Sequence, residues 1–168
     1  MGDHVSAVAR MGALWLAGVA LVVTAVVVSP AQANDGGSVI VKGKKWYDSP
    51  ISLYQGRWYS EKHNDARVCI RFRESRHRYE AVSSTGKYRG AYQFSPELTV
   101  GAGWMVQKEL RATGTPKREA IAIGRMLRAH KMNHWAPYWQ EMAFWLVWRK
   151  GEGRSHWPTG PGCPGYYR

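Results

Sequence analysis

Hydrophobic positions recur with helical spacing in four stretches of the chain, each opened or closed by a capping residue, a proline or a glycine. The predicted helices cover residues 65–75, 96–110, 116–130 and 137–150. Gly101 and Gly103 are expected to divide the second stretch into two short helices. The run Met142–Trp148 is apolar on all sides. It therefore predicts that the last helix is the buried centre of the domain.

The pattern changes between Glu80 and Phe94, where Ser, Thr and Gly interrupt short aromatic pairs. Such punctuation is typical of a short hairpin or loop bent at glycines. Together these elements predict a mainly helical single domain with one small Gly-rich hairpin.

The N-terminus predicts an exported protein. Arg10 is followed by the apolar run Met11–Val28 and then by the small-residue site Ala31-Gln32-Ala33. This order is typical of a secretory signal peptide cleaved after Ala33. A retained membrane anchor is the alternative, because the run is just long enough to span a bilayer. The resulting division is a signal peptide over 1–33, a flexible basic and aromatic extension over 34–61, and the domain over 62–168. The aromatic residues of the extension either pack on the domain or touch a ligand.

The charge points to a polyanionic partner. Lys and Arg number 24 and Asp and Glu 12, for a net charge of +12. Such an excess of positive charge favours binding to nucleic acid, anionic lipid or an anionic wall polymer. Export removes nucleic acid from these candidate partners. Export also means an oxidising compartment, so we expect Cys69 and Cys163 to form a disulfide. We expect a monomer.

Glu74 is the candidate for acid–base chemistry. It lies at the end of the first predicted helix, just before the hairpin. A partly desolvated carboxyl at such a place can serve as a general acid for glycoside cleavage. The alternative is a surface glutamate paired with Arg71 or Arg78. Four arginines surround Glu74, and a nearby cation opposes that role unless the side chains point elsewhere. They are Arg71, Arg73, Arg76 and Arg78.

The residues around Glu74 carry a family resemblance. The chain reads Glu74-Ser75, Ala81-Val82-Ser83, Gly86 and then Gly90-Ala91-Tyr92-Gln93. This order resembles the E-S, A-V-S, G and G-L-M-Q motifs of lytic transglycosylases. The stretch 89–95 also looks like the G-G-L-Q-F-S segment of resuscitation-promoting factors, and Trp157-Pro158 with Cys163 is similar to their W-P-V-C ending.

The resemblance implies an α+β, lysozyme-like domain that is mainly helical and carries one small Gly-rich β-hairpin. It implies a secreted or wall-associated enzyme acting on peptidoglycan, with anionic wall polymers and other wall hydrolases as further candidate partners. Glu74 matches the single catalytic acid/base. The matched or candidate substrate-binding residues are Ser75, Thr85, Tyr88, Tyr92, Gln93 and Trp104. Of these, the three aromatic residues are candidates for stacking on sugar.

The chain departs from the family pattern at several places. The family's E-S-G-G is Glu74-Ser75-Arg76-His77 here, and the leucine and methionine of G-L-M-Q are Ala91 and Tyr92. In the resuscitation group a cysteine directly precedes the catalytic glutamate, whereas Cys69 lies five residues before Glu74.

The mechanism implied has one carboxylate. A retaining glycosidase needs a second carboxylate about 5 Å from the first, but residues 81–96 contain no Asp or Glu and only Glu80 lies nearby. This favours lytic transglycosylation over hydrolysis. Two alternatives stay open: a degenerate wall-binding protein that keeps the fold without turnover, and a basic exported protein that binds anionic surfaces by charge alone.

No cofactor or metal is expected. His130 and His134 have zinc-ligand spacing, but Lys131 stands where a metalloprotease motif has glutamate, and no third ligand is evident.

Overall fold

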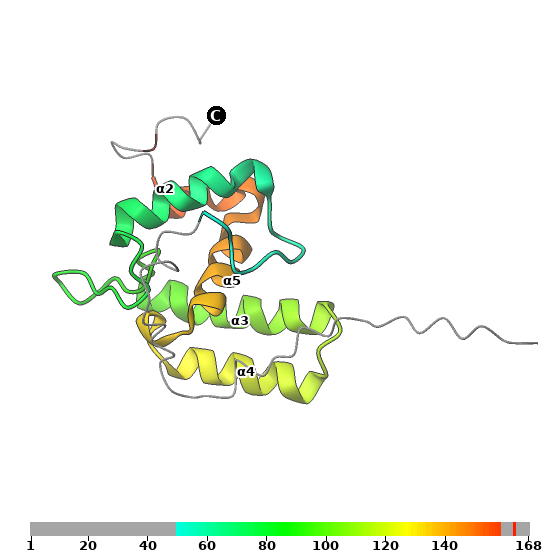
Figure 1. Ribbon diagram of the computed structural model, residues 1–168. Coiled ribbons are helices and arrows are strands. Elements are labelled where there is room, and N and C mark those ends of the chain that lie inside the picture. The colour runs from blue at the N-terminus through cyan, green and yellow to red at the C-terminus, as the bar shows by residue number, and fades with distance from the viewer. Residues whose placement is uncertain (1–49, 159–162, 164–168) are drawn as a thin grey trace, which may run out of the picture.

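The computed structural model describes residues 50–158 and Cys163. Within them the chain is mainly helical, as predicted, and Figure 1 shows α5 between α2 and α3, with α4 packed on the far side of α3. These helices are α2 (Asn64–Ser75), α3 (Pro96–Ala112), α4 (Lys117–Ala129) and α5 (Pro137–Trp148). Three 3-10 helices join or extend them: η2 (Glu61–His63), η3 (Met132–His134) and η4 (Arg149–His156). No helix among the described residues is long and apolar enough to cross a membrane. The predicted signal peptide lies outside these residues.

Helix α5 is the buried centre of the domain, as its sequence predicts. Every residue from Trp139 to Trp148 is buried. The ring of Phe144 stacks on Trp148 with centroids 5.6 Å apart and on Tyr92 with centroids 4.5 Å apart. Burying such large rings supplies much of the hydrophobic stabilisation of a domain this small.

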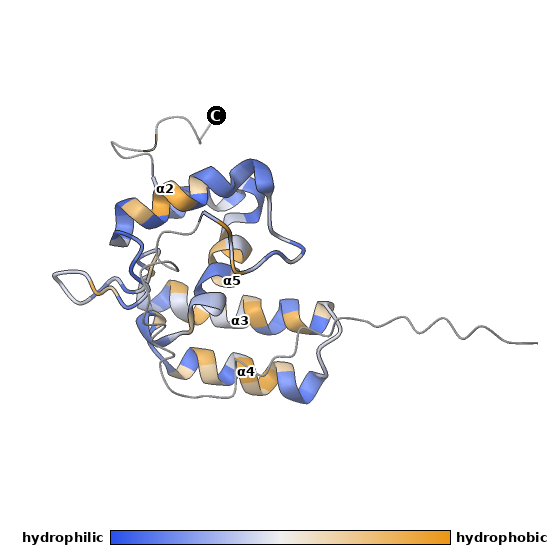
Figure 2. Cartoon of the chain, in the orientation of Figure 1, coloured by the Kyte–Doolittle hydropathy of each residue, from blue (hydrophilic) through white to orange (hydrophobic). Residues whose placement is uncertain are grey.

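Helix α3 runs unbroken from Pro96 to Ala112, so the predicted division at Gly101 and Gly103 is wrong. Helix α4 packs so closely on α3 that a Cβ at Gly103 would lie 2.6 Å from Cγ of Arg128. The glycine therefore serves close helix packing instead of ending the helix. Figure 2 shows hydrophobic and hydrophilic residues interspersed along both helices, as amphipathic helices require.

The segment that precedes α2 packs on the domain. Tyr54 is buried, and its hydroxyl donates to Glu109 on α3. Ser52 is also buried, and Asn64 Nδ2 donates to the carbonyl of Pro50. The predicted extension over 34–61 is therefore wrong in its described part. The domain begins before residue 62, and the predicted packing of the aromatic segment is confirmed for Tyr54.

The segment 81–94 folds back on itself through isolated backbone bridges and contains no β-strand. Its two isolated antiparallel bridges join Val82 to Arg89 and Arg89 to Phe94. Gly86 and Gly90 both have positive φ, of 71° and 79°. At Gly90 a Cβ would lie 2.6 Å from Oε1 of Gln140, so only glycine fits there.

The described residues that follow η4 are Trp157, Pro158 and Cys163, which we call the C-terminal strap, and they contact the domain at two points. Cys163 forms a disulfide with Cys69 on α2, which confirms the predicted pairing. The buried indole of Trp157 donates to the carbonyl of Tyr92, 2.9 Å away, and packs against Phe94. The strap therefore holds α2 and the segment 81–94 together.

We predict that removing the disulfide lowers the free energy of unfolding by roughly 2–5 kcal/mol, because the cross-link closes a long loop in the unfolded chain. Denaturant unfolding of Cys163→Ser measures this loss. Cys69→Ser and the double variant are the controls, and both should lose the same amount, because they remove one shared bond. Complete alkylation of both thiols in the unreduced native protein would contradict the pairing.

Candidate functional site

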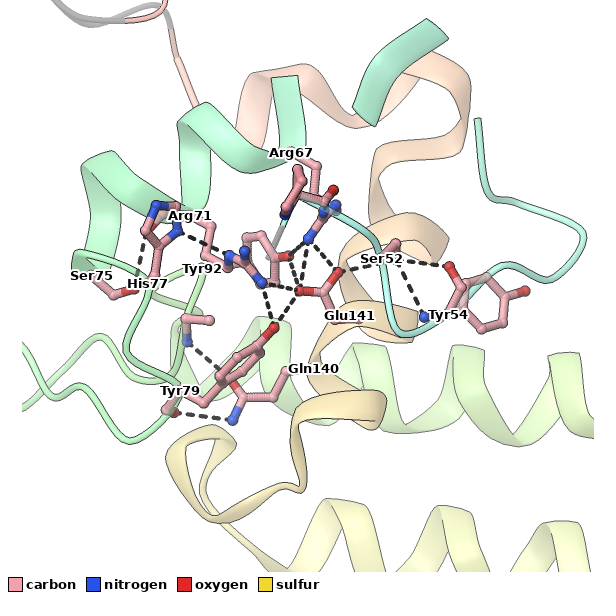
Figure 3. A network of polar contacts seen from close by, with 12 residues as sticks. Ser52, Tyr54, Arg67, Arg71, Ser75, His77, Tyr79, Tyr92, Gln140 and Glu141 are labelled. Atoms are coloured by element: carbon pink, nitrogen blue, oxygen red, sulfur yellow. Dashed lines mark hydrogen bonds and ion pairs between the residues drawn. The ribbon is translucent and has the colours of Figure 1, made fainter. Parts of the chain in front are cut away.

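A fully buried carboxylate, Glu141 on α5, is the centre of the largest polar network in the described chain (Figure 3). Arg67 and Arg71, one turn apart on α2, approach it with guanidinium nitrogens at 2.7 and 2.9 Å. Three hydroxyl groups also donate to its oxygens: those of Ser52 at 3.1 Å, Tyr79 at 2.6 Å and Tyr92 at 2.7 Å. Glu141 thus joins α5 to α2, to the N-terminal segment and to the loop that follows α2.

The network holds two buried cations against one buried anion. Arg67 and Arg71 are as inaccessible as Glu141. Removing a single partner from a buried ion pair commonly costs about 3–5 kcal/mol, because a charge is left without compensation. Burial and the adjacent Glu141 charge both raise the pKa of Tyr79 and of Tyr92 above the ordinary tyrosine value. Their hydroxyls therefore stay protonated and keep donating.

The neighbouring Gln140 fixes the loop between α2 and α3. Its Oε1 accepts from the backbone N–H of Ala91 at 2.8 Å. Its Nε2 donates to the carbonyls of Tyr79 at 3.1 Å and Trp135 at 2.9 Å. Two consecutive residues of α5 thus position α2 and the loop relative to each other.

Helix α2 ends in two residues with left-handed backbone, Arg76 (φ 54°) and His77 (φ 63°). The N–H of His77 donates to the carbonyl of Arg71, and that of Arg76 to the carbonyl of Phe72. The bond from Arg76 to Phe72 spans four residues, as in the αL capping motif, in which glycine is usual at the left-handed position. The strain is offset by side-chain contacts: Arg71 Nε donates to Nδ1 of His77 at 3.1 Å, and Arg76 lies over the ring of Phe72.

Glu74 lies in the last turn of α2, with 26% of its side chain exposed. Its Oε1 accepts from both Nε and Nη2 of Arg73, at 3.0 and 2.7 Å. Arg73 also donates to the carbonyl of Pro158 in the C-terminal strap. Since the preceding residue, Trp157, donates to the carbonyl of Tyr92, a chain of contacts connects Glu74 to the loop before α3.

The four arginines around Glu74 have different contacts. Arg71 points into the buried network, Arg76 lies over Phe72, and Arg78 Nε donates to the carbonyl of Ser75. Only Arg73 forms an ion pair with Glu74 among the described residues. The pairing partners that the sequence offers, Arg71 and Arg78, therefore do not hold this carboxylate.

Two predicted substrate-binding residues are buried. Tyr92 is 1% exposed, with its ring against Phe144 and its hydroxyl on Glu141, so the prediction that it stacks on sugar is wrong. Ser75 is 4% exposed, and its hydroxyl donates to the carbonyl of Arg71 and accepts from the N–H of Arg78. Ser75 shapes the end of α2 and does not present its hydroxyl to a ligand.

The other predicted residues are more accessible. Tyr88 and Thr85 are exposed on the segment 81–94, where Thr85 lies within hydrogen-bonding distance of Ser83. Gln93 is partly buried, has a φ of 51°, and donates from Nε2 to the carbonyl of Gly90. Trp104 lies on α3, where its side chain is exposed. The contacts place Thr85, Tyr88 and Gln93 on one loop but do not place Trp104 beside them.

The Glu141 network was not among the features predicted from the sequence. Gln140 and Glu141 immediately precede the apolar run Met142–Trp148. Two polar residues within a helix that is predicted to be buried were therefore the available signal. A charge there requires a buried counter-charge, and Arg67 and Arg71 at helical spacing were the candidates. Among the described residues no group of His, Cys, Asp or Glu could hold a metal ion.

Comparison of the chain with protein-family models, with curated proteins and with solved structures found no match.

We predict that the protein loses stability at alkaline pH because of its buried tyrosines. Burial and the nearby Glu109 raise the pKa of Tyr54 to about 12, and the pKa values of Tyr79 and Tyr92 are also raised. A group with a raised pKa in the folded state stabilises it fully below its unfolded pKa, here 10.0, and progressively less as pH rises above that value. Spectrophotometric titration should find fewer ionised tyrosines in the native protein than in denaturant, up to the pH of unfolding. Coincident curves would contradict the buried network.

We also predict that Arg76→Gly stabilises the protein relative to Arg76→Ala by about 1–2 kcal/mol, the cost of a left-handed residue with a Cβ. Both variants lose the contact with Phe72, so their difference reports the backbone alone. Denaturant unfolding measures it. Equal stability of the two variants would show that Arg76 is not strained.

Proposed function

We propose that this protein is an exported enzyme that cleaves the glycan strand of peptidoglycan between MurNAc and GlcNAc, with Glu74 as its single acid/base. In this proposal α2 and the segment 81–94 form the active-site half of a lysozyme-like domain. The segment takes the place of a small β-hairpin, reduced here to isolated bridges.

The observation that carries the proposal is the backbone conformation at the motif positions. The family pattern E-S-G-G has glycines where this chain has Arg76 and His77, and both adopt the left-handed conformation that glycine favours. Gly86 and Gly90 match motif glycines, and both have positive φ. This agreement supports the resemblance beyond residue identity, because an arginine such as Arg76 rarely adopts the left-handed conformation.

The proposed reaction needs one group that first gives and then takes a proton. The acid form of Glu74 protonates the glycosidic oxygen as the bond from that oxygen to C1 of MurNAc breaks, which releases the GlcNAc hydroxyl. The carboxylate then accepts the proton of the MurNAc C6 hydroxyl as that oxygen bonds to C1. The product is an anhydro sugar, the proton is returned to Glu74, and no water is consumed.

The position of Glu141 supports a one-carboxylate mechanism. Its carboxylate accepts from two arginines and three hydroxyls inside the core, so it is not available as a nucleophile beside Glu74. In the proposed complex, Thr85, Tyr88 and Gln93 bind the sugars from the loop.

The ion pair of Glu74 favours a second candidate function. Arg73 binds Glu74 through two nitrogens, and a general acid must hold a proton instead of an ion-pair partner. In the proposed enzyme, bound substrate displaces Arg73, which is also anchored to Pro158. If the pair stays closed, the molecule is a catalytically degenerate wall-binding protein with the same fold.

The test is the release of soluble fragments from purified peptidoglycan. Glu74→Gln keeps the size of the side chain but removes the proton, so activity should fall by about 10²–10⁴-fold. Glu80→Gln is the matched control, because it makes the same change at an exposed position six residues away; it should retain most activity. Wall binding by Glu74→Gln should persist.

Wild-type activity that survives in Glu74→Gln would contradict the assignment of Glu74. Tight wall binding by a folded wild type that releases no fragments would establish the binding protein instead.

A further inference from the structure

Trp104 on α3 is the most exposed aromatic side chain among the large hydrophobic residues of the described chain, at 55%. Val100, one turn earlier on the same side of α3, is 44% exposed. An exposed indole of this size in a domain rich in buried tryptophan marks a candidate contact surface. Helix α4 packs on α3 and is at the end of the molecule away from α2 (Figure 1).

Arg128 of α4 lies against Trp104. Its Cζ is 3.4 Å from the ring centroid, and its Nη1 donates to Gln107 at 3.1 Å and to the carbonyl of Gly103 at 3.4 Å. The close approach depends on two glycines, since a Cβ at Gly103 or at Gly124 would lie 2.6 Å from a side-chain atom of the facing helix. The indole and the guanidinium are thus held together before any ligand binds.

Further cations share this side of the two helices. At about 100° per residue, Lys108 and Arg111 follow Trp104 along α3. By the same periodicity three residues of α4 lie on the side of Arg128. They are Lys117, Arg118 and Arg125, all exposed. We call the surface formed by Trp104, Arg128 and these five residues the α3–α4 seam.

Few acidic side chains lie on the seam to neutralise its positive charge. Glu119 points to the opposite side of α4 by its helical position, and Glu109 is buried on α3 against Arg57. Glu97 lies on the Trp104 side of α3 but at its N-terminal end, two turns before the indole. Burial lowers the pKa of Arg128, and the charge of the neighbouring Arg125 lowers it further.

We propose that the α3–α4 seam binds an anionic polysaccharide, with a sugar ring on Trp104 and phosphate or carboxylate groups on Arg128, Arg125 and Lys108. The inference extends the proposed function, because it assigns wall attachment to a surface separate from Glu74. Single-stranded nucleic acid is bound by successive stacking aromatics, whereas the seam offers one. A membrane would require a wider apolar patch. One indole among cations fits a charged polysaccharide best.

The test is binding of the full mature chain to purified walls in the Glu74→Gln background, so that the walls are not consumed. One wall sample keeps its anionic phosphodiester polymer, and a second has been stripped of it and offers only the carboxylates of peptidoglycan. Lys108→Gln with Arg125→Gln should weaken binding to the first sample by roughly tenfold, the effect of losing two exposed ion pairs. An equal loss on the stripped sample would assign the seam to carboxylates, and a loss only on the first sample would assign it to phosphates.

The matched control is Lys62→Gln with Arg149→Gln, which removes the same two charges from exposed positions outside the seam. Trp104→Ala should weaken binding even at high salt, because stacking is not screened as charge is. Circular dichroism and thermal unfolding establish that each variant is folded.

Equal losses in the seam and control variants would overturn the proposal, as would competition by an oligonucleotide or by anionic vesicles that matches competition by the soluble polysaccharide. These outcomes are independent of turnover. If the protein does not cleave peptidoglycan, the binding measured for the seam remains valid. If the seam does not bind walls, the cleavage measured for Glu74 remains valid.

Discussion

The carboxylate of Glu141 is the constraint on which the rest of the structure depends. A fully buried charge is tolerated only with compensating charge and hydrogen bonds, and here these come from three separate segments. Arg67 and Arg71 lie on α2. Tyr79 and Tyr92 lie on the loop that follows α2, and Ser52 lies on the segment that precedes it. An apolar contact between α2 and α5 would permit sliding and rotation. The directional bonds to Glu141 select one placement of α2.

This placement determines where Glu74 can act. Arg71 connects the network to the strained turn after Glu74 through His77, and Gln140 holds the loop through the N–H of Ala91. The end of α2 and the loop are thus positioned by adjacent residues of one buried helix. The α3–α4 pair lies outside this arrangement, so the wall-binding surface proposed there is separate from the residues around Glu74.

Much of the fold could be predicted from the sequence, because caps, prolines and helical periodicity are local signals. The starts of α3 and α5, the buried nature of α5 and the Cys69–Cys163 disulfide are confirmed. The errors arose where tertiary contact overrides local preference. Gly103 serves helix packing instead of helix termination, and Tyr92 is drawn into the core by Glu141. No local pattern reveals that a carboxylate and two arginines 70 or more residues apart are paired.

The central claim is that Glu74 cleaves peptidoglycan without a second carboxylate and without water. The most direct measurement is mass spectrometry of the fragments that the wild-type protein releases from purified peptidoglycan in isotopically labelled water. The account predicts anhydro-muropeptides whose new sugar ends carry no oxygen from the solvent. Reducing ends that carry the labelled oxygen would contradict the one-carboxylate mechanism. Absence of any released fragment from the folded protein would contradict the enzyme itself.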